Sequence, residues 1–405
     1  MIQFRPDQGI PRHILLMMAV LAGVTVANLY YNQPLLELIC RDTGISQVEA
    51  NLITVFTQTG YALGLLFIIP LADMLPVRKI TITAMVLAAA SAFLMAKAVN
   101  VWMLWVSSLT LGLCSIVPQL FVPMATLYSE PQNKSRNMGL VMSGLLSGIL
   151  SARFISGYTG SWLGWRGMFY IVCALMIIGL AVILFMMPQA TQSFKGTYKE
   201  LMHTVGHIFV SQPKIRLYSL RAAMGFGSLL PIWACLAFHL AQPPFLAGSD
   251  KVGMLSLCGM AGALAASGVG KYVPKVGVRR MSVIGSLCQL SAWVVAFLIG
   301  HTYAGLIIAI ILVDIGSQYQ QISNQSGSLQ QLPQATNRVN TIFMTTFFVM
   351  GSLGTFCAGQ SWSLAGWTGV CLVGATFPVI SLILSAFDRD AKGSFDAKGS
   401  FKNAS

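Results

Sequence analysis

The sequence alternates long apolar runs with short polar turns. A transmembrane helix needs about 20 mostly apolar residues, and twelve runs along the chain come close to this length or exceed it. Only 9% of the residues are charged, against about 25% in a soluble domain, so most of the surface is expected to face lipid. The pattern predicts an all-α membrane protein whose twelve transmembrane helices lie at residues 13–36, 48–71, 80–98, 101–125, 138–160, 167–187, 216–241, 252–273, 281–299, 303–324, 340–359 and 367–387.

One connection is longer and more polar than the others. It spans residues 188–214 and predicts a cytoplasmic central loop between an N-terminal six-helix half at 1–187 and a C-terminal six-helix half at 215–387. Residues 388–405 contain a repeated polar motif that is too short to bury a core, so we expect a disordered cytoplasmic tail.

The two halves share loop motifs at a nearly constant spacing. Three pairs of motifs fall in equivalent loops, which is difficult to explain without an internal duplication. An even number of helices in each half makes the repeats parallel, with a site expected between the halves near the membrane midplane. The pairs are Arg78-Lys79 with Arg279-Arg280, Pro131-Gln132 with Pro333-Gln334, and Gly164-Trp165 with Gly366-Trp367.

Positive charge is distributed unevenly between alternate loops, within a formal net charge of +13. With both termini in the cytoplasm, the outer loops hold only Arg41, Lys97, Arg166 and Lys251, whereas the cytoplasmic loops hold most of the other basic residues. Because cytoplasmic loops carry the excess of Lys and Arg, this pattern predicts a multi-pass protein of the cytoplasmic (inner) membrane with both termini inside. It also argues against nucleic acid as the partner of the basic residues.

The loop between the second and third helices carries the most specific motif. It reads Leu71-Ala72-Asp73, followed by Arg78-Lys79. This resembles the Gly-x-Leu-Ala-Asp-Arg-x-Gly-Arg-Arg pattern of the major facilitator superfamily, and its twelve-helix drug/proton antiporter branch in particular. The chain departs from that branch at Ser108–Gly112, which lacks the arginine of helix 4, and at Ala152-Arg153, which replaces a Gly-Pro step in helix 5.

The resemblance implies two pseudo-symmetric six-helix bundles and a latch on the cytoplasmic face. A carboxylate at a helix end beside basic residues can form such a latch. The alternative is that these residues are ordinary interfacial charges that follow the orientation rule. The residues expected at this cytoplasmic gate are Asp73 and Arg78, together with Arg136, Arg279 and Arg338 from related loops.

Two ionisable residues lie deep within apolar runs, Asp314 in the tenth predicted helix and Arg153 in the fifth. Each costs about 2.5–3.5 kcal/mol at a helix centre on insertion scales, so each needs a partner or a function. We expect Asp314 to bind the coupling proton, with Arg153 modulating it or pairing with an anionic group of the substrate. The alternative is a purely structural ion pair between the two side chains.

Polar side chains on several helices are expected to line a cavity. A stripe at helical spacing follows Asp314, and the first, second and fourth helices offer further amides and tyrosines. The alternative for each amide is a hydrogen bond between helices, worth about 0.6 kcal/mol. The candidates are Asn28, Tyr31, Asn32, Gln58, Tyr61, Gln119, Gln318 and Gln321.

These features favour a secondary active transporter over an enzyme. The sequence has no phosphate-binding Gly-x-x-x-x-Gly-Lys-Ser/Thr loop, so the energy must come from an ion gradient, and it has no nucleophile–base or metal-binding motif. We expect a monomer that moves a small solute of unidentified structure by alternating access. Coupling to protons and efflux by antiport are favoured over uptake by symport or a non-transporting sensor. No cofactor and no metal are expected.

Overall fold

A computed structural model of the chain describes residues 9–187, 196–259 and 275–388, together with residues 3, 4, 7, 189, 190 and 273. Within these residues, nine helical stretches are long and apolar enough to cross a membrane. Two of them, of 53 and 54 residues, fold back on themselves at Gly164 and at Ala365–Gly366, so the described residues make eleven crossings. The remaining predicted helix, 252–273, begins inside the described residues and continues outside them. The all-α membrane fold is confirmed, and the eleven crossings of the described residues agree with the predicted twelve helices.

The N-terminal half consists, in its described part, of seven α-helices and three short 3₁₀ helices. The long helix α7 turns at Gly164, whose φ of 70° is readily available to glycine and costly for other residues. The elements are α1 (Arg12–Val26), η1 (Ala27–Leu29), η2 (Gln33–Leu35), α2 (Leu36–Thr43), α3 (Gln47–Phe67), η3 (Ile69–Asp73), α4 (Val77–Ala96), α5 (Val101–Cys114), α6 (Val117–Leu127) and α7 (Lys134–Met186).

The C-terminal half follows a short amphipathic helix, α8 (Tyr198–Ser211). A parallel pair of two-residue strands, β1 (Gln3–Phe4) and β2 (Gln189–Ala190), joins the N-terminus to the connection between the halves. The remaining described elements are α9 (Pro213–Ala241), α10 (Ser249–Ser256), η4 (Leu257–Gly259), α12 (Val278–Ile299), α13 (Tyr303–Gln331), η5 (Pro333–Ala335) and α14 (Thr336–Ala386).

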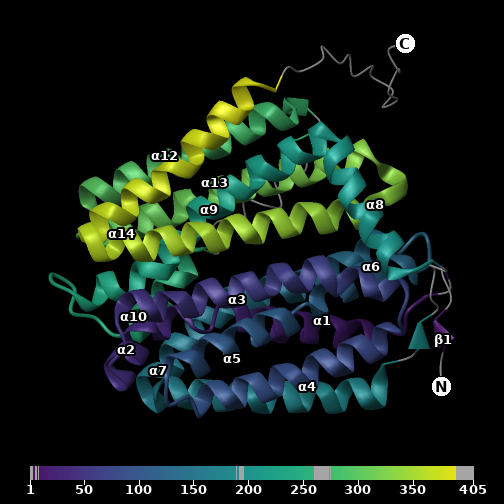
Figure 1. Cartoon of the computed structure of the whole chain (residues 1–405), viewed down its shortest axis with the longest axis horizontal. Coiled ribbons are helices and arrows are strands. Elements are labelled where there is room, and N and C mark those ends of the chain that lie inside the picture. Colours follow the sequence, from purple (N-terminus) through teal and green to yellow (C-terminus); the bar gives the residue numbers. More distant parts are fainter. Residues whose placement is uncertain are drawn as a thin grey trace.

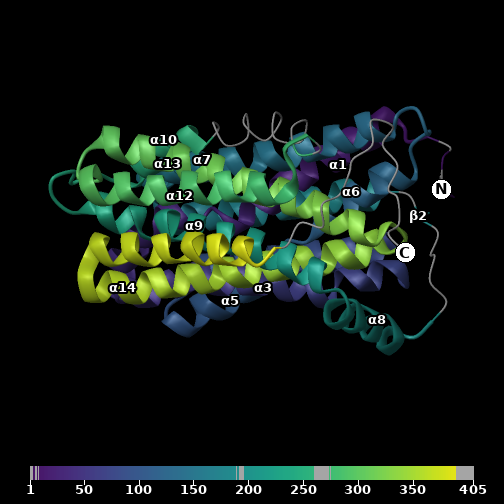
Figure 2. The same cartoon turned by 90° about the horizontal axis from the view of Figure 1, so that it is seen from above.

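The two halves lie side by side with their helices running along the same axis. In Figure 1 the helices of the N-terminal half form the lower layer, and α9, α12, α13 and α14 form the upper layer. One end of the bundle carries the N-terminus and α8, which lies outside the helical layers (Figure 2). We call this the Asp73 end, because Asp73 closes η3 there, and the opposite end, where α7 turns, the Gly164 end.

Two of the expected helices are interrupted. The first crossing passes from α1 through η1 and η2 to α2, and the fourth breaks between α5 and α6. Pro118 explains the second break, since a proline ring clashes with the carbonyl four residues earlier, here that of Cys114, the last residue of α5. A capping box begins the second crossing, where Ser46 and Glu49 each bond the other's backbone N–H.

Close backbone contact holds the first and fifth crossings together. A Cβ atom at Gly148 would collide with the carbonyl oxygen of Gly23, and one at Gly144 would collide with that of Ala19. Membrane helices gain little from the hydrophobic effect against each other, so small residues that allow close packing stabilise their association. The small residues of the fifth crossing therefore permit close contact with the first.

The internal duplication is visible in hydrogen bonds as well as in sequence. Arg78 donates from Nη2 to the carbonyl of Leu184 at 2.7 Å, and Arg279 donates from Nε to the carbonyl of Ser385 at 2.8 Å. Arg279 follows Arg78 in the sequence by the same number of residues as Ser385 follows Leu184, so the two bonds occupy equivalent positions in the two halves. The arginine that begins the third crossing of each half thus binds a carbonyl at the end of the sixth, where cations interact favourably with the helix dipole.

Candidate functional site

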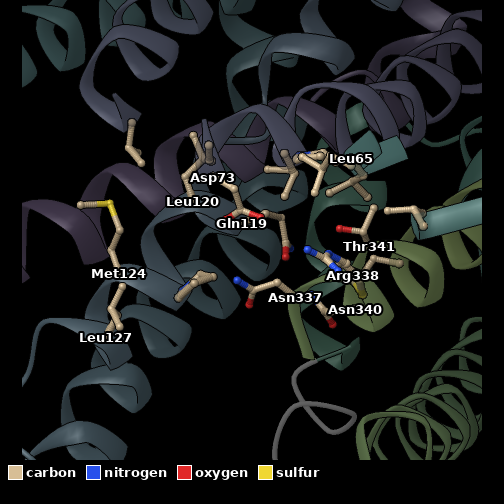
Figure 3. Close-up of a pocket in the computed structure, with 18 of the residues that line it drawn as sticks. Leu65, Asp73, Gln119, Leu120, Met124, Leu127, Asn337, Arg338, Asn340 and Thr341 are labelled. Carbon is tan, nitrogen blue, oxygen red and sulfur yellow. The ribbon is translucent and has the colours of Figure 1, made fainter. Parts of the chain in front are cut away.

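A pocket lies between the two halves at the Asp73 end. Its volume is about 120 Å³, enough for several water molecules. In Figure 3, Gln119 and Asp73 from the N-terminal half face Arg338, Asn337 and Thr341 from α14. The charges of Asp73 and Arg338 are close enough to attract each other. The pocket is therefore a vestibule with a largely apolar lining, an acidic side chain on the wall from the N-terminal half and a basic one on the wall from α14.

Helix α8 covers part of this vestibule and touches both halves. Its Leu201 and Val205 line the pocket, and Val205 also packs in a small apolar cluster with Val339 and Ile342 of α14. On the other side, the Tyr198 hydroxyl donates to the carbonyl of Phe67 in α3 at 3.0 Å. The connection between the halves thus includes a helix that spans the mouth of the vestibule.

At the Gly164 end the two halves are in direct contact. A Cβ at Gly157 of α7 would lie 2.5 Å from the carbonyl oxygen of Ser249 and 2.8 Å from the Cα of Gly253 in α10. Across the other seam, Trp362 of α14 donates to the Oε1 atom of Gln47 in α3 at 2.7 Å. The pocket between the halves at this end has a volume of only about 30 Å³. The interface is therefore closed at the Gly164 end and hollow at the Asp73 end.

Four aromatic rings lie between the vestibule and the deeper part of the interface. Tyr61 meets Phe348 edge-on at 4.5 Å between ring centroids, and Phe226 stacks on Phe347 at 4.1 Å. Tyr61 also accepts a hydrogen bond from Gln119, which lines the vestibule. We call Tyr61, Phe226, Phe347 and Phe348 the aromatic layer. Its rings lie on the side of the vestibule that faces the interior of the bundle.

Beyond the aromatic layer, charged and polar side chains from four crossings meet between the halves. Arg153 donates from Nε to the Oε1 atom of Gln33 at 2.6 Å. Its guanidinium carbon lies 4.7 Å from the ring centroid of Tyr30 and 4.2 Å from that of Trp233. The carboxylate of Asp314 comes from α13 in the C-terminal half, and it lies close enough for its charge to interact with that of Arg153. We call Arg153, Gln33, Tyr30, Trp233 and Asp314 the central cluster.

The central cluster lies well inside the bundle. Arg153 lies three helical turns before the bend at Gly164, and Asp314 lies three helical turns after Tyr303, the first residue of α13. Each position is about 16 Å along its helix from the Gly164 end. These positions agree with the prediction that both ionisable side chains lie deep within membrane-spanning helices.

Several polar atoms of the central cluster have no hydrogen-bond partner among the described residues, although solvent cannot reach them. They are Nε2 of Gln33, Nε1 of Trp233 and Oδ2 of Asp314. Such an atom costs about 1–3 kcal/mol when left unsatisfied, and two donors and one acceptor are present here. The ion pairs of the described residues do not include one between Arg153 and Asp314. The structural ion pair considered from the sequence is therefore not formed.

The amides expected to line a cavity in the N-terminal half bond mainly to neighbouring helices. Asn28 donates to Ser115 at 3.1 Å, and Asn32 donates to Thr57 at 3.0 Å. Gln58 reaches the carbonyl of Leu29, which places it beside Tyr30 of the central cluster, while Tyr31 is buried in the apolar core. Among the remaining candidates, Tyr61 belongs to the aromatic layer and Gln119 lines the vestibule. The side chains of Gln318 and Gln321 are half-buried on α13. Their roles in substrate binding stay predictions.

The residues expected at the cytoplasmic gate separate into two groups. Asp73 and Arg338 share the vestibule, whereas Arg78 and Arg279 bind helix ends within their own halves, and Arg136 is exposed near the start of α7. The sequence placed the acidic side of the latch beside Arg78, but the structure gives Asp73 a basic neighbour from the opposite half. A gating role for these residues stays a prediction.

A second buried charge pair was missed from the sequence. Arg221 of α9 donates to Oδ2 of Asp388 at 2.7 Å and to Oδ1 of Asn324 at 2.9 Å, and both members of the ion pair are buried. Arg221 lies within the predicted helix 216–241, so the sequence indicated that this charge enters the membrane. Nothing in the sequence indicated that Asp388, far away in the chain, is its partner. Asp388 therefore packs with the C-terminal half rather than belonging to a disordered tail, and the rest of that tail lies outside the described residues.

Comparison with known proteins gives the chain its family. Residues 15–355 match the family model described as Major Facilitator Superfamily. The "uncharacterized transporter YgaY" of Escherichia coli is 33% identical over 94% of this chain and 96% of its own length. The "Probable transporter SCO4007" of Streptomyces coelicolor is 27% identical over 94% of this chain and 89% of its own.

Solved structures share the fold at low sequence identity. The crystal structure of nucleoside transporter NupG superposes with a TM-score of 0.72 at 13% identity, covering 92% of this chain and 97% of that one. A bacterial homologue of the human lysosomal transporter Spinster, in an inward-facing and unoccupied conformation, gives a TM-score of 0.72 at 15% identity, covering 93% and 95%. A helical membrane fold, paired halves and relatives named as transporters lead to one conclusion: the chain is a transporter rather than an enzyme, and it belongs to the Major Facilitator Superfamily.

Proposed function

We propose that this chain exports a small solute across the cytoplasmic membrane in exchange for protons, with Asp314 as the proton-binding group. The observation that carries the proposal is the position of this carboxylate. It lies deep in the bundle, at the interface of the halves, and one of its oxygens is inaccessible to solvent and has no hydrogen-bond partner within the described part of the chain. A carboxylate in that position is expensive when charged and less so when protonated, so its protonation state changes the relative free energies of the two conformations.

The charges around Asp314 support a role in coupling. The titratable groups that face it are Arg153 and Tyr30 from the N-terminal half and Cys258 from the segment after α10. Because Arg153 and Asp314 belong to different halves, any rearrangement of the halves changes the field that the carboxylate experiences. Proton binding and the conformation of the transporter are therefore linked in both directions.

Antiport follows if the proton and a cationic group of the solute compete for the same carboxylate. Each one then leaves Asp314 only when the other can take its place, which couples export of the solute to entry of the proton. The resemblance to drug/proton antiporters favours the same direction. We place the Asp73 end in the cytoplasm on the basis of the uneven distribution of Lys and Arg, so the state described here is the one closed to the outside.

The test of coupling does not need the solute. Spin labels across each end of the bundle, in a cysteine-free variant reconstituted in liposomes, report the populations of the two conformations as a function of pH. We expect a pH-dependent redistribution in the parent and its loss in Asp314→Asn. The control is Asp250→Asn, which removes a partly exposed carboxylate at the start of α10 and should leave the redistribution unchanged. A pH response of undiminished size in Asp314→Asn would exclude this carboxylate as the coupling site.

A further inference from the structure

The central cluster holds one positive and one negative side chain, and neither is neutralised by a contact ion pair. Arg153 is 6% exposed, and its described hydrogen bond goes to the neutral amide of Gln33. The ion pairs of the described residues include neither Arg153 nor Asp314. Two opposite charges that interact only at a distance, without a contact ion pair, are costly in a low-dielectric interface, and a ligand that carries both complementary charges would offset both costs at once.

The surroundings of Arg153 suit an anionic group of a ligand. The guanidinium lies near the faces of Tyr30 and Trp233, at 4.7 and 4.2 Å from their centroids. Cation–π contacts of this kind hold the group in place without using the N–H donors at its edge. Those donors match a carboxylate in a planar, two-point arrangement. The side-chain N–H groups of Gln33 and Trp233, which have no acceptor among the residues that the structure describes, add two neutral donors to the same region.

The surroundings of Asp314 suit a cationic group. Its Oδ2 atom is an inaccessible acceptor to which no described residue donates, and a Cβ at Gly259 would lie 3.2 Å from that oxygen and 3.8 Å from the ring of Trp233. The glycine therefore lets its own backbone approach both the carboxylate and the indole closely. Trp233, which is fully buried, lies next to both charged side chains and presents an apolar face to whatever connects the two ends of a ligand.

From these contacts we propose that the central cluster binds a small zwitterion, with its carboxylate at Arg153, its ammonium at Asp314 and its apolar part against Trp233. The inference rests on the proposed function, because it assigns a substrate class to the same site. A lone cation would face the repulsion of Arg153, and a lone anion that of Asp314. The pair therefore selects against ligands of a single sign as well as for zwitterions.

The test compares ligands that differ only in charge. The purified protein in detergent is titrated calorimetrically with glycine, β-alanine, leucine and phenylalanine, with their methyl esters as monocations, and with their N-acetyl derivatives as monoanions. We expect at least one zwitterion to bind about 10-fold or more tightly than both of its single-charge derivatives, since each lost contact is a hydrogen bond to a charged group.

Two variants make the test specific to the assigned ends. Arg153→Gln should reverse the preference towards the methyl ester, and Asp314→Asn towards the N-acetyl derivative, because each removes the repulsion that excluded that class. A variant that merely unfolds cannot produce a reversal. Trp233→Phe keeps an aromatic ring and removes the N–H, and should weaken zwitterion binding severalfold. Lys251→Gln, an exposed residue at the Gly164 end, is the matched loss of a surface charge and should change nothing.

Three results would overturn the assignment. They are the absence of binding by every zwitterion in the set, equal binding of a zwitterion and one of its single-charge derivatives, and an unchanged preference in both charge variants. Failure here is distinguishable from failure of the proposed function, because the pH response of the spin-labelled protein needs no solute. A retained pH response with no zwitterion binding would remove the substrate class and leave proton coupling in place.

Discussion

Replacing Gly157 by alanine should open the Gly164 end of the bundle. The new methyl group would lie 2.5 Å from the carbonyl oxygen of Ser249 and 2.8 Å from the Cα of Gly253. Both neighbours are backbone atoms, so a change of rotamer cannot relieve the collision. Overpacking of this kind costs about 1–3 kcal/mol. The cost applies only to the conformation in which α7 and α10 touch, so it shifts the ratio of the two conformations by about 5-fold to 150-fold towards the one open at the Gly164 end.

Distances between spin labels across each end measure this shift. Trp162 and Leu364 lie at the Gly164 end in different halves and are 82% and 87% exposed, and Gln132 and Gln334 are exposed at the Asp73 end. The labels are placed on introduced cysteines after the eight native ones, all of them free, have been replaced. In Gly157→Ala the pair at the Gly164 end should gain a longer distance, while the pair at the Asp73 end gains a shorter one.

The matched control lies in the same helix. A Cβ at Gly139 would have no atom within 4 Å, so Gly139→Ala makes the same chemical change in α7 without a collision, and its distance distributions should match those of the parent. Unchanged distances in Gly157→Ala would refute the reasoning, as would an equal shift in Gly139→Ala. The first result would mean that the contact yields without opening the seam, and the second that the shift comes from helix propensity rather than packing.

Three further predictions follow from other contacts. At Gly359, the pseudo-symmetric equivalent of Gly157 in the C-terminal half, Gly359→Ala should also favour opening at the Gly164 end in the same labelling experiment, but less strongly, because the atoms it would meet belong to the Asn51 side chain. Breaking the buried pair of Arg221 and Asp388 with Asp388→Ala should destabilise the protein by about 3–5 kcal/mol; thermal unfolding in detergent should show the loss, and equal stability of parent and variant would argue against the pair. The Tyr198 hydroxyl, protonated at neutral pH as an ordinary tyrosine is, donates to the carbonyl of Phe67. Tyr198→Phe should therefore speed amide hydrogen exchange in α8 up to about 10-fold, and unchanged exchange would show that apolar contacts alone hold the helix.

The sequence by itself determined the class of fold, because the constraint is local and severe. Hydrocarbon cannot satisfy backbone hydrogen bonds, so each crossing must be a helix of about 20 apolar residues, and such runs can be counted directly. The capping box at Ser46 and Glu49 is equally local, since both partners lie within one helical turn. The duplication was readable because equivalent loops kept the same motifs at one spacing.

The contents of the site were decided by tertiary structure. The sequence identified Asp314 and Arg153 as deep charges, because burying a charge in lipid is conspicuous whatever its partner. It did not show that Arg153 meets Gln33, which belongs to a different crossing, and lies against Tyr30 and Trp233. Amides and aromatic rings are common in membrane helices, so nothing in their local pattern marks those that point into the interface.

The same limit explains the pairings that were missed. Asp73 shares the vestibule with Arg338, and Arg221 binds Asp388, and in each case the two partners are far apart in the chain. Hydropathy reports how deep a residue lies along its own helix, but not the rotation of that helix or its neighbours. Those are set by backbone contact at positions such as Gly157, where the presence or absence of one methyl group determines how closely two helices approach.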